Sequence, residues 1–188
     1  MQRNRQAGGM NIEIKHPSEK EAILELKKRK EIEYMDFEIN ESGRVVELTF
    51  HGNEMEEIPE IIKVFSQLKY LKIGGDFFIK NKIKKIENLD NFTELEILDL
   101  ENNQIRKIEG LEKLVRLKKL FLAWNKIKKI EGLDNLSKLQ ILDLLGNQIK
   151  KIEGLERLSQ LRVLFLHHNW IEEIEGLENL SQLKKVET

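Results

Sequence analysis

A 22-residue period runs through the second half of this chain and constrains its fold more than any other feature. Two of the repeated stretches are "LFLAWNKI" (120–127) and "LFLHHNWI" (164–171). Four complete units each open with a leucine, followed by two more leucines, an asparagine, two isoleucines and "EGL"; they open at Leu95, Leu117, Leu139 and Leu161, and a partial unit opens at Leu183. One such unit is too short to bury its own apolar face. The period therefore predicts a solenoid in which stacked units share one core.

Two earlier units follow the pattern more loosely. One begins at Val45, and the other begins at Leu68, which is 27 residues before Leu95 and so carries five extra residues, near 74–80 in "GGDFFIK". We interpret residues 45–188 as a repeat array of about six units. Residues 10–44 do not repeat and are interpreted as an N-terminal cap, with residues 1–9 as a disordered tail.

The consensus "LxxLxLxxNxIxxIEGL" resembles that of leucine-rich repeats. Its 22-residue form is similar to the subclass typified by the regulatory subunit of type-one protein phosphatase, to which an axonemal dynein light chain and bacterial internalins are also related. The resemblance covers 45–188. It implies an α/β solenoid shaped as a horseshoe, with a parallel sheet on the concave face and short turns or 3-10 segments on the convex face. It implies no particular partner.

The residues support the same architecture without the resemblance. The strand leucines of each unit are two positions apart, so they point to one side and their neighbours point to the other. The asparagine after each strand can bond backbone groups that the turn leaves free. We therefore assign a structural role to these asparagines, which are Asn103, Asn125, Asn147 and Asn169.

Both ends of the array carry signals of their own. Ser18, followed three residues later by Glu21, predicts a helix N-cap with a capping box. The alternating "MDFEI" and "RVVELTF", separated by "NESG", predict a hairpin that completes a helix-plus-hairpin cap. At the other end Leu183 and Val186 begin a further strand with no polar cap after it. The short tail, a partner, a second copy or a missing segment is then needed to cover that edge.

Composition and motifs argue against several classes of function. The chain has no cysteine, and its 32 basic and 33 acidic residues leave a net charge of -1. The paired lysines of "KIKKIEGL" run beside a ladder of acids, so we interpret them as a solvated face and expect no nucleic-acid partner. The N-terminus is polar and no apolar run reaches membrane-spanning length, so we expect a cytoplasmic protein without a membrane partner. Phosphate-loop, nucleophile-elbow and "HExxH" motifs are absent, so we expect no enzyme, metal or cofactor.

The positions beside the inward leucines should line the concave face. Clustered apolar side chains on an exposed face indicate an interaction site, with aromatic residues as its anchors and acids selecting a basic partner. The candidate partner-binding residues are Ile97, Asp99, Glu101, Phe121, Trp124, Ile141, Asp143, Leu145, Val163, Phe165, His167, His168 and Trp170. Scattered surface apolar residues, with the two tryptophans folded onto neighbouring repeats, are the alternative. Phe77 and Phe78 of the insertion are candidate loop contacts or a local plug over the first units.

We therefore predict a non-enzymatic module or adaptor that binds a protein partner on its concave face. Two alternatives stay open. The first is a self-assembling repeat protein that forms a homo-oligomer through its C-terminal edge. The second is a regulatory subunit of a phosphatase or a small GTPase.

Overall fold

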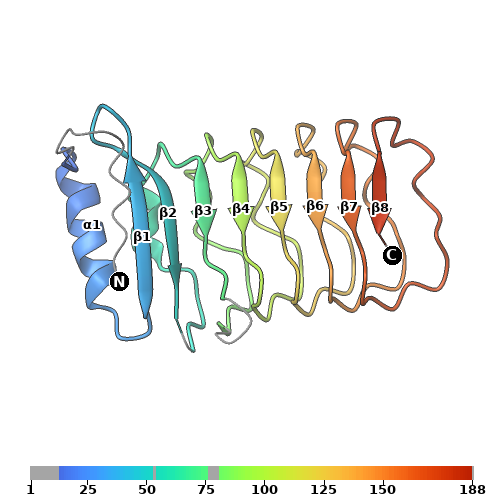
Figure 1. Cartoon of the computed structure of the whole chain (residues 1–188), viewed down its shortest axis with the longest axis horizontal. Coiled ribbons are helices and arrows are strands. Elements are labelled where there is room, and N and C mark those ends of the chain that lie inside the picture. The colour runs from blue at the N-terminus through green and yellow to red at the C-terminus, as the bar shows by residue number, and fades with distance from the viewer. Residues whose placement is uncertain (1–12, 53, 76–80, 188) are drawn as a thin grey trace.

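The computed structural model describes residues 13–52, 54–75 and 81–187 as one continuous solenoid. It begins with helix α1 (Pro17–Lys28) and continues through eight strands that form a single sheet in the order of the chain (Figure 1). The strands are β1 (Tyr34–Ile39), β2 (Val45–His51), β3 (Tyr70–Lys72), β4 (Ile97–Asp99), β5 (Lys119–Phe121), β6 (Ile141–Asp143), β7 (Val163–Phe165) and β8 (Lys185–Glu187). Only the β1–β2 pair is antiparallel.

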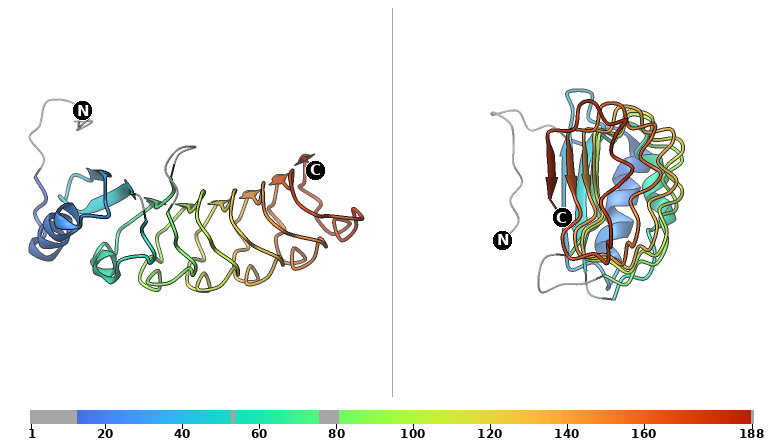
Figure 2. Two further views of the ribbon diagram at one scale, coloured as in Figure 1. Left: turned by 90° about the horizontal axis from the view of Figure 1, so that it is seen from below. Right: turned by 90° about the vertical axis from the view of Figure 1, so that its right-hand side faces the viewer.

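The sheet lines the inner side of a curved molecule, as the sequence predicts. Figure 2 shows the strands along the concave side and the returning segments along the convex side. A 3-10 helix (Glu60–Val64) forms the first convex segment, and turns form the later ones. The repeats are in phase, because Leu98, Leu120 and Leu142 lie at matching positions of successive strands. The predicted parallel-sheet solenoid is confirmed.

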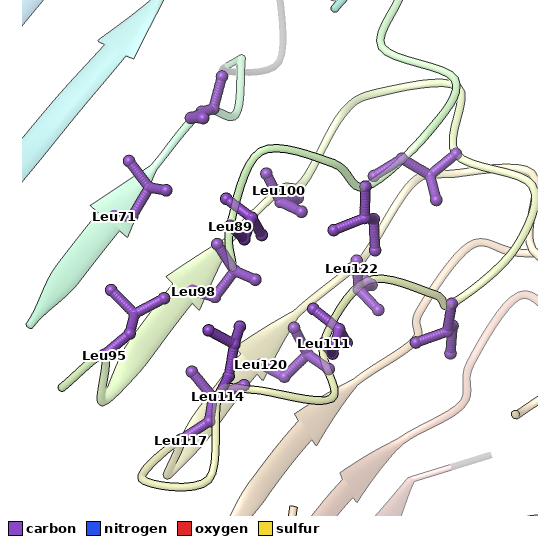
Figure 3. Packing of buried hydrophobic residues seen from close by; sticks show 14 of the residues in the cluster. Leu71, Leu89, Leu95, Leu98, Leu100, Leu111, Leu114, Leu117, Leu120 and Leu122 are labelled. Carbon is purple, nitrogen blue, oxygen red and sulfur yellow. The ribbon is translucent and has the colours of Figure 1, made fainter. Parts of the chain in front are cut away.

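Leucines and isoleucines fill the space between the sheet and the convex turns. Three leucines of one repeat are completely buried: Leu98 from the strand, Leu111 from the segment that leads back from the strand, and Leu114 from the convex turn. Figure 3 shows that these side chains point into the interior, with Leu98 beside its equivalent Leu120 in the next repeat. Since each side chain packs on the repeats before and after it, burial is shared along the array and an internal unit is not stable alone.

The constant 22-residue spacing of the asparagines produces a hydrogen-bond ladder between repeats. The Asn125 side chain donates to the Leu100 carbonyl of the preceding repeat at 3.0 Å and accepts from the Ile105 N–H at 2.9 Å. It also donates to the carbonyls of Leu122 and Ala123 in its own turn. Asn147 repeats the pattern one unit later. The predicted structural role of these asparagines agrees with these bonds.

Helix α1 closes the first repeat, but it begins two positions earlier than the sequence suggested. Its N-cap is His16 and no side chain caps it, with Pro17 at the first helical position. The prediction of Ser18 as N-cap was wrong because proline already has the backbone angle of a first helical residue and needs no N–H partner there. The Ser18 hydroxyl instead lies 3.1 Å from Nδ1 of His16.

A buried carboxylate joins the helix to the sheet. Glu19 is completely buried and accepts hydrogen bonds from the Arg44 guanidinium at 2.7 Å and from the Val45 N–H at 2.8 Å. The charged hydrogen bond from Arg44 offsets the free-energy cost of removing the Glu19 carboxylate from water. Together with the predicted hairpin of β1 and β2, which forms with Tyr34 opposite His51, this contact fixes the cap on the first repeat.

The last repeat differs from the others in its burial. Ile174 is 62% exposed and Val186 is 36% exposed, whereas their equivalents one repeat earlier, Ile152 and Leu164, are 4% and 0% exposed. Among the described residues, no strand pairs with the outer edge of β8. Within that same part of the chain, no helix has the length and apolar character needed to cross a membrane.

Candidate protein-binding surface

The strand registers arrange the outward side chains of the repeats in columns across the concave face. In-register pairing places each outward residue beside its equivalent on the next strand, about 4.8 Å away. The first column is Tyr70, Ile97, Lys119, Ile141, Val163 and Lys185. The second column is Lys72, Asp99, Phe121, Asp143, Phe165 and Glu187. Two residues further along the chain, Glu101, Ala123, Leu145 and His167 form a third column.

An apolar cluster occupies the middle of these columns. We call it the concave patch, and its members are Ile97, Phe121, Ile141, Leu145, Val163 and Phe165, each of which is partly exposed. Ile141 lies beside Val163 on the next strand, whereas Lys119 separates Ile141 from Ile97 in the first column and Asp143 separates Phe121 from Phe165 in the second. Ala123, in the third column, is buried and adds no exposed surface. These six side chains lie on the concave face, and their role in binding stays a prediction.

Acidic side chains alternate with the aromatic rings of the second column. Phe121 lies between Asp99 and Asp143, and Phe165 lies between Asp143 and Glu187. The Lys185 ammonium lies 5.4 Å from the Phe165 ring centroid, within cation–π range. A group that docks on this column therefore meets a hydrophobic ring and a carboxylate within one strand spacing.

Asp99 is less accessible than the sequence suggested. It is only 7% exposed, and one carboxylate oxygen pairs with the Lys72 ammonium at 2.8 Å. Its other oxygen accepts the Glu101 N–H at 3.1 Å. Asp99 thus positions the backbone at Glu101 and has its charge matched by Lys72, which limits its direct contact with a partner.

Glu101 and Asp143 are the acids whose charge is poorly compensated. Burial, with the nearby charges of Asp99 and Asp143, raises the pKa of Glu101 to about 7, although Lys72 opposes the shift. Burial also raises the pKa of Asp143, and the Leu145 N–H bonded to its carboxylate offsets part of that effect. A cation brought by a partner would stabilise both ionised carboxylates. This pair is the electrostatic feature of the site.

Trp124 and His168 form a second aromatic feature just beyond the strand ends. Trp124 and His168 have a φ of +56° and Gly146, between them in the repeat order, has +68°. The Trp124 and His168 rings stack with their centroids 5.8 Å apart. A Cβ on Gly146 would lie 2.5 Å from the Trp124 ring, so the indole covers the Gly146 backbone and reaches across one whole repeat. Trp124 remains 43% exposed.

Other predicted site residues lie apart from the concave patch. Trp170 is 55% exposed but follows the turn, in the segment that leaves the sheet, where its N–H donates to the Ile149 carbonyl. His167 Nδ1 lies 3.8 Å from the Glu187 carboxylate, at the last repeats. The candidate loop contacts Phe77 and Phe78 lie outside the described residues. Within the described ranges, no group of three or more histidines and acids is arranged to hold a metal.

Sequence reasoning missed two residues that shape this surface. Gly146 makes room for the Trp124 ring. The sequence signal for this was that Gly146 occupies the same repeat position as Trp124 and His168, in the repeat between them. Lys72 neutralises Asp99, and the signal was its position next to Asp99 in the second column.

Comparisons with known proteins agree with this architecture. Residues 76–113 and 115–157 match the family model described as leucine-rich repeats in two copies. The structure is similar to an internalin (inlF) of Listeria monocytogenes, with 26% identity, a TM-score of 0.61, and coverage of 77% of this chain and 48% of that one. Internalin C2 of the same species is 25% identical with a TM-score of 0.61, covering 75% and 70% of the two chains.

A leucine-rich repeat protein of Leptospira interrogans is 26% identical with a TM-score of 0.65, over 74% of this chain and 36% of that one. This chain thus spans less than half of the first internalin and of the Leptospira protein. No curated protein matches the sequence significantly. The family match covers leucine-rich repeats within residues 76–157, and the fold of the chain is similar to that of leucine-rich repeat proteins.

Proposed function

We propose that this chain is a non-enzymatic binding module that docks a protein partner on its concave face. The concave patch carries the proposal, because six partly exposed apolar side chains gather on one face of neighbouring repeats, with charged residues between them. Clustered apolar side chains on an exposed face mark protein interaction sites, and phenylalanine is among the residues enriched in them. Leucine-rich repeat proteins generally mediate protein–protein interactions, which is consistent with the proposal.

The charges of the site indicate the chemistry of the partner. Asp143 lies between the two phenylalanines of the concave patch and Glu101 lies beside it, and burial raises the pKa of both carboxyl groups. A lysine or arginine from the partner, placed between them, would replace the water that they have lost. The matching partner surface is therefore apolar with at least one basic side chain at its centre.

We also infer that the repeats belong to the 22-residue subclass typified by the phosphatase regulatory subunit. The support is the spacing: Leu95 and the four later opening leucines keep the same 22-residue interval. This assignment concerns the form of the repeat, and the partner class is argued from the site.

The test is a capture experiment from a lysate of the source cells, with wild type and two variants as baits. The two variants differ in where apolar surface is removed. The first carries Phe121→Ser and Phe165→Ser on the concave patch. The control carries Leu24→Ser and Val115→Ser, two exposed apolar residues of helix α1 and a convex turn. The proposal predicts a protein captured by wild type and by the control, and lost by the concave variant with an unchanged melting curve. Equal capture by all three baits would refute concave docking.

A further inference from the structure

The concave face carries a different charge over its first four strands than over the later ones. The registers of β1 and β2 place their outward residues in the same columns as those of the later strands. On or just after β1–β4, the charged residues of these columns are five acids and one lysine: Asp36, Glu38, Glu47, Asp99, Glu101 and Lys72. On β5–β8 the acids and lysines of the same columns balance: Asp143, Glu187, Lys119 and Lys185. The excess negative charge thus lies over β1–β4.

Two of these acids repel each other across β1 and β2. Glu38 and Glu47 are directly opposite in the antiparallel pair, and both side chains face solvent. Partial desolvation of Glu47, together with the charge of Glu38, raises the pKa of Glu47, and among the described residues no lysine or arginine opposes that shift. Like charges at opposite positions destabilise a sheet. A cation supplied from outside the fold would relieve this repulsion.

Aromatic rings lie among the acids of the first strands. Tyr34 is 39% exposed and stacks on His51, with the ring centroids 5.0 Å apart and the ring planes 13° from parallel. Tyr70 lies between Glu47 and Ile97 in the first column. A guanidinium group can bond a carboxylate with two N–H groups and stack on a flat ring, and an ammonium group is also attracted to the ring face. The side chains of β1–β4 therefore suit arginine and lysine.

The acidic strands and the concave patch form one continuous sheet face. Figure 1 shows β1–β4 next to helix α1 and β5–β7 following them along the molecule. Five strand steps separate Glu47 on β2 from Val163 on β7, and these correspond to about 24 Å at the spacing of neighbouring strands. An α-helix of about 16 residues spans that distance, as do about 7 residues of extended chain. One short segment of a partner is therefore long enough to contact both halves of the face.

We infer that the partner docks through a single segment with basic residues toward one end, which lies over β1–β4, and apolar residues toward the other, which lies over β5–β7. The inference rests on the proposed concave docking and adds the composition and the direction of the docked segment. The reversed direction places basic side chains on Phe121 and Phe165 and leaves the repulsion between acids unrelieved. The asymmetry of the face thus selects one direction by attraction and disfavours the other.

The probe for this inference is a set of peptides selected on the purified chain from a random phage-displayed library of about 16 residues, the length of a helix that spans the face. Wild type should enrich peptides that carry lysine or arginine toward one end and leucine, phenylalanine or tryptophan toward the other. Their affinities for the variants are then measured by fluorescence anisotropy.

Glu38→Lys is the informative variant because it should weaken binding without weakening the fold. The new lysine lies opposite Glu47 and turns a repulsive pair into an attractive one, so the melting temperature should not fall. The same lysine repels the basic end of the segment, and the selected peptides should bind about tenfold more weakly or worse. Glu131→Lys makes the same change of charge at an exposed convex position and should leave the affinity unchanged.

The direction of the segment is measured with spin labels, since the chain has no cysteine of its own. Ser42→Cys lies in the turn between β1 and β2, and Ser159→Cys lies in the turn before β7; both positions are exposed and outside the concave patch. A label at position 42 should broaden the NMR signals of the basic end of a bound peptide. A label at position 159 should broaden those of the apolar end. The opposite pattern overturns the inference.

The remaining outcomes separate this inference from concave docking itself. Selected peptides that lack the basic end and bind Glu38→Lys as tightly as wild type overturn the inference. If those peptides are lost by the Phe121→Ser, Phe165→Ser variant, concave docking stands. Peptides that bind both variants like wild type contradict concave docking, and the inference falls with it. A selection that enriches no peptide also overturns the inference.

Discussion

Replacing Glu101 with glutamine should make the protein more stable at alkaline pH and leave it little changed at acid pH. The pKa of this carboxyl is about 7 in the folded chain, against an ordinary value of 4.5. Between those values the folded state keeps a proton that the unfolded state has released, so the free energy of unfolding falls as pH rises from 4.5 to 7. This pKa difference corresponds to about 3 kcal/mol, and the partial exposure of Glu101 reduces the expected effect to about 1–2 kcal/mol.

Urea unfolding at pH 5 and at pH 8, followed by circular dichroism, measures this effect. The Glu101→Gln variant should gain about 1–2 kcal/mol over wild type at pH 8 and much less at pH 5. Glu131→Gln removes a charge at an exposed convex position and is the matched control. A gain of the same size at both pH values, or a loss at pH 8, would show that burial does not oppose the ionisation of Glu101.

Further predictions concern the core, the ladder, the aromatic contact and binding. Leu120→Ala, at a completely buried strand position, should lower the free energy of unfolding by about 2–5 kcal/mol in urea titrations. Asn125→Ala removes four hydrogen bonds to backbone groups and should cost roughly 2–4 kcal/mol by the same measurement, with a cost near zero contradicting the ladder. Gly146→Ala places a Cβ against the Trp124 ring and should shift tryptophan fluorescence to longer wavelength as the indole is displaced into water. Affinity for a basic partner, measured by calorimetry, should rise from pH 6 to pH 8 as Glu101 ionises, and Glu101→Gln should remove most of that rise.

The regular part of the structure was predictable because the period fixes it. Once Leu98 and Leu120 occupy matching places 22 residues apart, the parallel register and the alternation of buried and outward residues follow. The hydrogen bonds of Asn125 follow as well, since every repeat leaves the same backbone groups free. The concave position of Phe121 and Phe165 could be read from this alternation alone.

Features that depend on contacts between different columns were not predictable in this way. The stacking of Trp124 on His168 requires left-handed backbone at three successive turns and the absence of a side chain at Gly146. The raised pKa of Glu101 results from its burial beside Asp99 and Asp143, which no spacing rule reveals. At the other end, no sequence signal marks the helical Glu19 as buried, whereas in the structure it is completely buried and bonded to Arg44.

Site-directed photo-cross-linking tests concave docking most directly. A photoreactive benzoylphenylalanine replaces Phe121 in one variant and Val115, on a convex turn, in another, and each is irradiated in a lysate of the source cells. Concave docking predicts one discrete cross-linked protein from position 121, competed away by unlabelled wild type and absent from position 115. A cross-link of equal strength from both positions, or from position 115 alone, would contradict the assignment of the concave face as the binding surface.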